Sequence, residues 1–205
     1  KGNPVSDYKD VMAQVFAALA LNNVTTLPGL PSSDPMKKVG ANIESIFGVM
    51  VDSLRRTATP PQVRALVALA WDLFEYKEVI TAIGPDVGSM HMTVFRQDGK
   101  IKALVLIPKH WISMVQANLH EQFGALVFTA SQCADFYARK MDVPETRPQV
   151  MARARAYEAE YLLSVPKAEL KLTVYQRRLL AENPKGLGSL PAGIAYPLAS
   201  YQKPS

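Results

Sequence analysis

The chain has 205 residues, of which 48% are apolar and 20% charged, a composition typical of a folded domain and unlike that of a disordered chain. Its only cysteine, Cys133, excludes an internal disulfide and therefore a small secreted scaffold held by disulfides. The formal net charge is +5, and the whole excess lies in the second half of the chain, where an anionic partner is expected to bind.

The first predicted helix follows Ser6 or Asp7, either of which can cap it, and runs to about Asn22. Its most apolar stretch, residues 11–21, is much shorter than the roughly 20 residues that a membrane-spanning helix needs. No membrane span is therefore expected. The single cysteine is compatible with a reducing compartment, and an intracellular or virion location is expected rather than secretion.

Two further helices are predicted before the middle of the chain. Asp34-Pro35 has the pattern of an N-cap and first helical residue, and this helix is expected to end near Arg55 and Arg56. Thr59-Pro60-Pro61 begins the next helix, which is apolar over most of its surface. It is predicted to be central, largely buried, and to end before Gly84-Pro85.

The stretch from Met90 to Ile107 predicts a β-hairpin, because Asp98-Gly99 at its centre is a preferred two-residue turn. Placing Gln97 opposite Lys100 puts an apolar set of side chains on one face of the hairpin. Both outer edges are then available for pairing with another chain. The alternative is that further short strands complete a small sheet.

Helical spacing returns after Pro108, with Gly124 as a candidate break, and Thr146 is expected to cap another helix. Pro166 is expected to open the last helix, which ends at Asn183-Pro184. The prediction is a mainly α protein with one β-hairpin, of the α+β class. It has a single helical domain over residues 1–182 and an extended Pro/Gly-rich C-terminal arm over residues 183–205.

The C-terminal arm combines prolines and glycines with large apolar residues. Such a segment cannot form a core alone, so it is expected to lie on the chain's own body or on a neighbouring subunit. Its predicted contact residues are Leu187, Leu190, Ile194, Tyr196, Leu198 and Tyr201.

No catalytic signature is found. His120-Glu121 resembles the start of the zinc-binding H-E-x-x-H pattern, but Gly124 stands where the second histidine should be. Cys133 could serve as a nucleophile only if the fold brought a histidine to it, and a lone helical cysteine is more often a core residue. The sequence therefore predicts no catalytic residue, no metal and no cofactor.

Basic residues gather towards the C-terminus. Lys167, Lys171 and Arg178 would share one face of a continuous helix, and further arginines precede them. The predicted anion- or nucleic-acid-binding residues are Arg153, Arg155, Lys167, Lys171, Arg177 and Arg178. Because glutamates are interspersed, the alternative is an ordinary solvated face of mixed charge.

These patterns favour a non-enzymatic structural subunit of a larger assembly, comparable to a coat protein or nucleoprotein. Its expected partners are other protein subunits, in a homo- or hetero-oligomer, and also nucleic acid at the basic helices. Two alternatives are an adaptor that binds acidic partners through the basic face, and an enzyme whose Cys/His site is assembled by the fold.

Overall fold

The computed structural model describes residues 35–58, 60–76, 78–84, 87–139, 147–192 and 194. Within these residues the chain forms six α-helices and one three-stranded sheet, which confirms the α+β class. The helix predicted over residues 7–22 lies outside the described residues. Three of the predicted arm residues do so as well: Tyr196, Leu198 and Tyr201.

The sheet contains the predicted hairpin. Strands β2 (His91–Gln97) and β3 (Lys100–Pro108) are antiparallel, with Gln97 opposite Lys100, so the predicted register is confirmed. The two turn residues both take positive φ angles, 53° at Asp98 and 76° at Gly99. This left-handed backbone is the one that a two-residue hairpin turn with matching strand twist requires.

A third strand, β1 (Val79–Gly84), pairs in parallel with β3 and gives the order β1-β3-β2. The helix predicted to continue until just before Gly84-Pro85 is wrong over these residues. The helix α3 (Pro61–Glu75) ends nine residues earlier than Gly84. Consequently the β3 edge of the hairpin is occupied, and only the outer edges of β1 and β2 are unpaired among the described residues.

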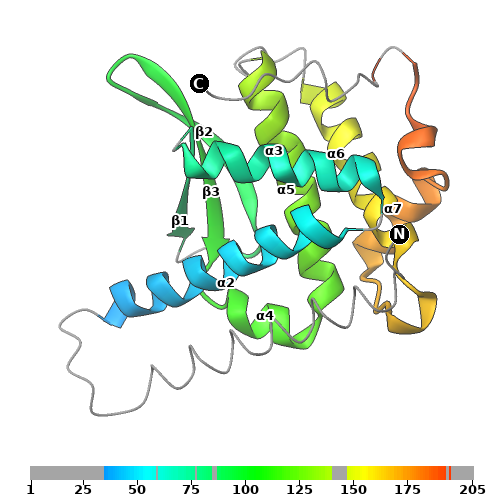
Figure 1. The fold of residues 1–205 in the computed structure, drawn as a ribbon, viewed down its shortest axis with the longest axis horizontal. Helices are drawn as coiled ribbons and strands as arrows, with labels where there is room; N and C mark the ends of the chain where they lie inside the picture. Colours follow the sequence, from blue (N-terminus) through cyan, green and yellow to red (C-terminus); the bar gives the residue numbers. More distant parts are fainter. Residues whose placement is uncertain are drawn as a thin grey trace.

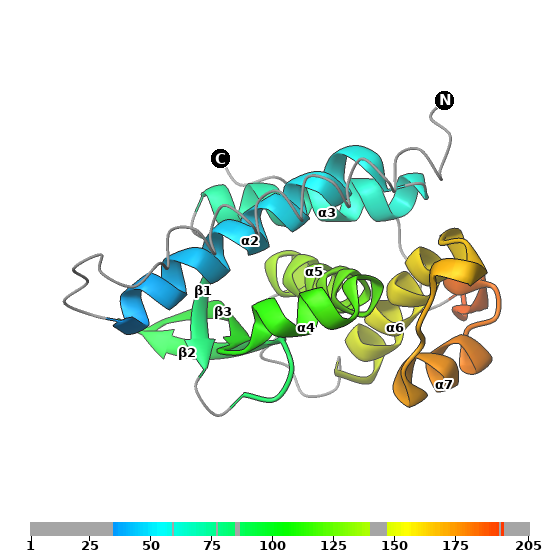
Figure 2. The same cartoon turned by 90° about the horizontal axis from the view of Figure 1, so that it is seen from below.

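Helices cover one face of the sheet. Side chains alternate along β3, and those on the core face are almost fully buried, at 1% for Ala103, 0% for Val105 and 1% for Ile107. They pack towards α2 (Pro35–Thr57), α3 and α5 (Leu119–Arg139). Figures 1 and 2 show the sheet at one end of the molecule and α6 and α7 at the other, with α5 between them.

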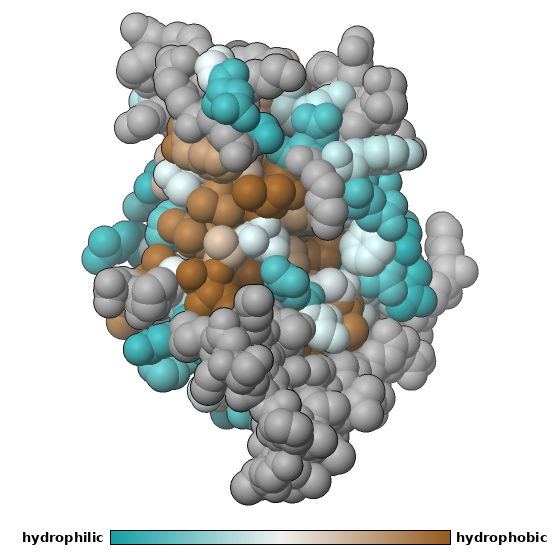
Figure 3. Space-filling view, turned by 90° about the vertical axis from the view of Figure 1, so that its left-hand side faces the viewer, coloured by the Kyte–Doolittle hydropathy of each residue, from teal (hydrophilic) through white to brown (hydrophobic). Residues whose placement is uncertain are grey.

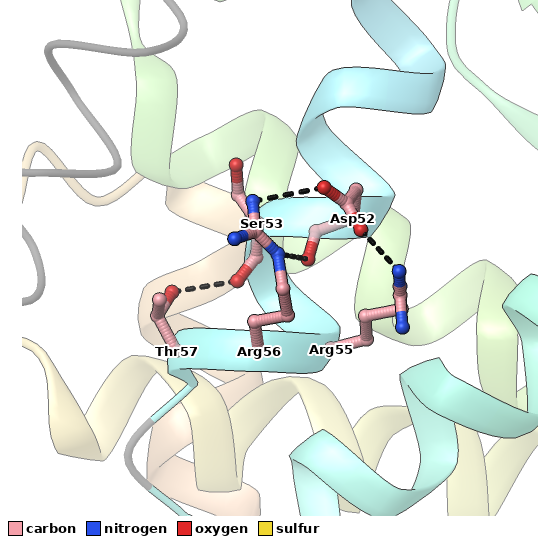
Figure 4. Close-up of polar contacts among 5 residues, drawn as sticks. All are labelled: Asp52, Ser53, Arg55, Arg56 and Thr57. Carbon is pink, nitrogen blue, oxygen red and sulfur yellow. Dashed lines mark hydrogen bonds and ion pairs between the residues drawn. The ribbon is translucent and has the colours of Figure 1, made fainter.

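The C-terminal turn of α2 is held by ion pairs and hydrogen bonds among its own residues (Figure 4). Asp52 pairs with Arg55 at 2.6 Å and with Arg56 at 2.8 Å, and the Thr57 hydroxyl donates to the Ser53 carbonyl at 2.6 Å. The Arg55 guanidinium also lies 4.6 Å from the ring centroid of Trp71 in α3. The predicted helix end near Arg55 and Arg56 is confirmed.

The break after the hairpin falls at Asn118 rather than at Gly124. It separates α4 (Trp111–Ala117) from α5, and the Asn118 side chain accepts a hydrogen bond from the Glu121 N–H at 3.3 Å. The same side chain donates to the Lys171 carbonyl at 2.7 Å. Asparagine thus caps the new helix, and Gly124 lies inside it.

The last predicted helix ends before Asn183-Pro184 as expected, but its predicted start at Pro166 is wrong. After α6 (Arg147–Ser164), Pro166 opens only a 3₁₀ turn, η2 (Lys167–Glu169). Helix α7 (Val174–Glu182) begins at Thr173, whose hydroxyl accepts from the Gln176 N–H at 3.0 Å in a capping box. This cap fixes the helix start eight residues later than the proline would suggest.

The first half of the C-terminal arm lies on the chain's own body. It forms a 3₁₀ turn, η3 (Gly186–Ser189), in which the Leu187 N–H donates to the Glu160 side chain of α6 at 3.0 Å. Gly186 has φ 56°, and a Cβ there would lie 3.0 Å from the Glu160 Cα, so glycine is required at this close approach. Further on, Arg153 of α6 donates to the Ile194 carbonyl at 2.8 Å.

Candidate functional site

A cavity of ≈ 470 Å³ opens between the start of β2, helix α5 and the segment that leads into α7. Its polar lining includes His91, Glu121, Glu158, Tyr175 and Gln176, and its apolar lining comes mainly from Met90, Met114, Ala125 and Phe128. A cavity of this size with an apolar wall and a few convergent polar groups has the character of a small-ligand site.

Glu158 is the most unusual side chain of this cavity, because it is a carboxylate with only 2% of its surface exposed. The Gln176 amide donates to its Oε2 at 3.1 Å. The pKa of Glu158 is raised to about 7, mainly by burial. The Gln176 hydrogen bond lowers this pKa, and the nearby charge of Glu121 adds to the increase. Near neutral pH both protonation states of Glu158 are therefore populated.

Gly124 makes room for this carboxylate. A Cβ at position 124 would lie 2.7 Å from Oε2 of Glu158 and 3.0 Å from Nε2 of Gln176. Glycine in a helix interior costs about 1 kcal/mol relative to alanine, so its presence here is explained by the close approach of the two polar side chains. The residue that breaks the H-E-x-x-H pattern thus lies directly against two side chains that line the cavity.

Tyr175 forms part of the opening, with 49% of its surface exposed. The pKa of its phenol is raised to about 12, mainly by burial. The charge of Glu158 adds to the increase, and Arg155 beside it opposes the increase. The His91 imidazole is exposed, and its Nδ1–H donates to the Ser89 carbonyl at 3.1 Å. The cavity is thus reached from solvent past an aromatic ring and an imidazole.

The histidine and cysteine considered as catalytic groups lie elsewhere. His120 is 3% exposed, its Nδ1 is 2.8 Å from the Tyr161 hydroxyl, and burial lowers its pKa to about 4. Cys133 is fully buried, and burial raises the pKa of its thiol to about 12. A thiol that does not ionise near neutral pH is a poor nucleophile, so the structure gives the Cys/His enzyme hypothesis no support.

Metal binding gains no support either. Across the part of the chain that the structure describes, no three His, Cys, Asp or Glu side chains are arranged to hold a metal ion.

The structure differs from the predicted basic surface in two respects. Arg153 is only 2% exposed and makes a two-pronged ion pair with buried Asp135, at 2.7 and 3.0 Å, so its assignment to an anion-binding surface is wrong. Lys171 lies outside any helix and Lys167 in a separate 3₁₀ turn, so neither shares a helix face with Arg178. The exposed members of the predicted set are Lys167, Lys171, Arg177 and Arg178, and Arg155 is partly buried.

A second surface feature is the face of the sheet that points away from the core. By the strand register this outer face carries Ile80 beside Leu104 and Ala82 beside Leu106, with Phe95 opposite Lys102. Ile80 is 38% exposed, and the other apolar members are partly exposed. Figure 3, which views the molecule from the side where the sheet lies in Figure 1, shows apolar residues gathered between polar ones.

A groove of ≈ 380 Å³ adjoins this outer face at strand β1. It is lined by residues of α2, α3 and β1, including Phe47, Trp71, Phe74 and Ile80. The apolar surface thus continues from the outer face of the sheet onto the two helices beside it.

Comparisons with known proteins give no family from which to interpret the cavity, the basic residues or the outer face of the sheet. No protein family model matches the chain, and neither the curated proteins nor the solved structures include a significant match. Among the described helices, none is both long and apolar enough to cross a membrane.

Glu158 and Gln176 were not among the site residues predicted from the sequence, and Glu121 was considered only as part of the rejected H-E-x-x-H pattern. A local signal exists for Gln176: Thr173 and Gln176 have the spacing of a capping box, which marks a helix start. The pairing of Glu121 with Glu158 has no local signal, because the two carboxylates belong to different helices that pack together.

Proposed function

We propose that this protein is a structural subunit of a larger protein assembly, comparable to a coat protein or nucleoprotein, and that another protein subunit docks on the outer face of the sheet. The observation that supports this most directly is the partly exposed apolar surface formed by Ile80, Leu104, Leu106 and Phe95. Contiguous exposed apolar surface of this kind marks interaction sites in soluble proteins.

The edges of the sheet add to this surface. Within the described residues, the outer edges of β1 and β2 are unpaired, so their backbone N–H and C=O groups are available to a partner strand. The groove beside β1 offers an apolar recess at one of these edges. A partner could therefore combine backbone pairing with burial of apolar side chains.

We assign the proposed assembly role of the C-terminal arm to its last residues. Leu187 and Ile194 belong to the part that contacts α6 of the same chain. An assembly function of the arm would rest on Tyr196, Leu198 and Tyr201. Deleting residues 196–205 should then weaken assembly while leaving the contacts of α6 in place.

The decisive experiment compares two matched substitutions. Ile80→Asp places a charge on the outer face of the sheet, whereas Leu163→Asp places the same charge on α6, where Leu163 is 51% exposed. Native mass is measured by size-exclusion chromatography with light scattering, and folding by circular dichroism. A large species that only Ile80→Asp dissociates supports the proposal. A monomeric unmodified protein, or equal effects of both variants, would refute it.

The nucleic-acid part of the proposal depends on the exposed cations Lys167, Lys171, Arg177 and Arg178. Absorbance at 260 and 280 nm across the same elution peak detects co-purifying nucleic acid. Binding through such cations should weaken steeply as salt is raised, and the double variant Lys171→Glu/Arg178→Glu should abolish it. Binding that persists in this variant would remove nucleic acid from the proposal.

A further inference from the structure

The cavity beside Glu158 is a place where two carboxylates meet without a cation. Glu121 and Glu158 both line it, and neither forms an ion pair with any residue that the structure describes. Among the residues that the structure describes, the only hydrogen bond to the Glu158 carboxylate comes from Gln176 and reaches Oε2. Its second oxygen, Oε1, is therefore left for a ligand in a side chain that is only 2% exposed.

We propose that this cavity binds an organic cation, an ammonium group carried on an apolar stem, through the carboxylates of Glu121 and Glu158. The ammonium would donate to Oε1 of Glu158 and to Glu121, while Met90, Met114 and Phe128 would surround the stem. An unpaired buried carboxylate is costly, and a bound cation removes that cost. A lysine side chain and a free alkylamine share this chemistry.

The other charged groups around the cavity do not already supply this cation. His91 lies at the β2 side with its Nδ1–H directed at the Ser89 carbonyl. Arg155 of α6 lies beside the phenol of Tyr175, and Glu182 of α7 adds negative charge there. The field at the carboxylates is thus dominated by Glu121 and Glu158 themselves.

The raised pKa of Glu158, about 7, gives binding a pH dependence that can be measured. An alkylammonium remains charged throughout, whereas Glu158 is ionised in roughly a tenth of molecules at pH 6 and in roughly nine tenths at pH 8. Affinity for the cation is therefore expected to be about tenfold higher at pH 8 than at pH 6.

The test is calorimetric titration of the full chain with n-hexylamine, n-hexanol and Nα-acetyl-lysine N-methylamide at both pH values. Both amines should bind, more tightly at pH 8, and hexanol should not. Preference for the lysine derivative would identify a polypeptide as the source of the cation, and preference for hexylamine a free amine. Hexanol binding as tightly as hexylamine, or amine binding independent of pH, would overturn the proposal.

Three substitutions complete the test. Glu158→Gln preserves the shape and a carbonyl that can accept from Gln176, and should weaken amine binding at pH 8 about tenfold or more and flatten its pH dependence. His91→Gln should leave the pH dependence in place, because we assign that dependence to Glu158. Glu44→Gln, in the separate groove beside β1, should change nothing. Unaltered binding by the Glu158 variant contradicts the proposal and leaves the assembly function untouched.

Discussion

Replacing Glu158 with glutamine should stabilise the fold, increasingly as pH rises from 4.5 through 7. The carboxyl group has an ordinary pKa of 4.5, which burial in the folded chain raises to about 7. A raised folded pKa contributes stability that is fully present below pH 4.5 and lost as pH rises through 7. At pH 8 the native protein therefore carries the cost of a buried charge that the neutral amide avoids.

The size of the effect follows from the shift of about 2.5 pKa units, each equivalent to about 1.4 kcal/mol. Glu158→Gln is thus expected to gain about 3 kcal/mol in the free energy of unfolding at pH 8, relative to its effect at pH 4.5. For a chain of this length 1 kcal/mol corresponds to roughly 2–4 °C in Tm. The difference between the two pH values should then be roughly 10 °C.

Thermal and urea unfolding of the native and Glu158→Gln proteins at pH 4.5 and pH 8 would measure this difference. The comparison at low pH removes any effect of the substitution on packing, because Glu158 is protonated there. Glu44→Gln, at an exposed position of α2, serves as the control and should show no change between the two pH values. Parallel stability curves for the native and Glu158→Gln proteins would refute the reasoning.

Three further predictions concern buried groups. Asp135→Asn leaves the buried Arg153 uncompensated and should cost about 3–5 kcal/mol in urea unfolding; a loss below 1 kcal/mol would contradict this. Gly124→Ala should destabilise by about 1–3 kcal/mol through the clash with Glu158, and in a Glu158→Ala background the penalty should disappear; an unchanged penalty would exclude that clash. The lowered pKa of His120, about 4, gives stability present above pH 6.5 and lost towards pH 4. His120→Gln should remove this acid sensitivity from urea unfolding measured at pH 7 and pH 4.5, and a persistent slope would assign it to other groups.

The parts of the fold that follow from the sequence are those with local signals. The hairpin register was predictable because Asp98-Gly99 demands a two-residue turn and the side chains alternate with period two. The strand β1 was not, since Val79, Ile80 and Ile83 also continue the helical spacing of α3. Its pairing with β3 is parallel and non-local, and no short-range pattern encodes it.

The candidate site was predictable only in part, for the same reason. Basic residues could be counted, but their burial could not: Arg153 is neutralised by Asp135 from a different helix, 18 positions earlier. Glu121 and Glu158 come together only through the packing of α5 against α6. Gly124 suggests a helix break when the sequence is considered alone. In the structure, glycine is needed there because the Glu158 side chain of another helix approaches closely.

The hydrogen bond from Arg153 to the Ile194 carbonyl has a consequence for the order of events during synthesis. The guanidinium lies in the interior, yet one of its partners is made 41 residues later in the chain. Until Ile194 has left the ribosome, this hydrogen bond to α6 cannot form. The helices that precede Ile194 can form earlier, and the contact between Arg153 and the Ile194 carbonyl is added to them afterwards.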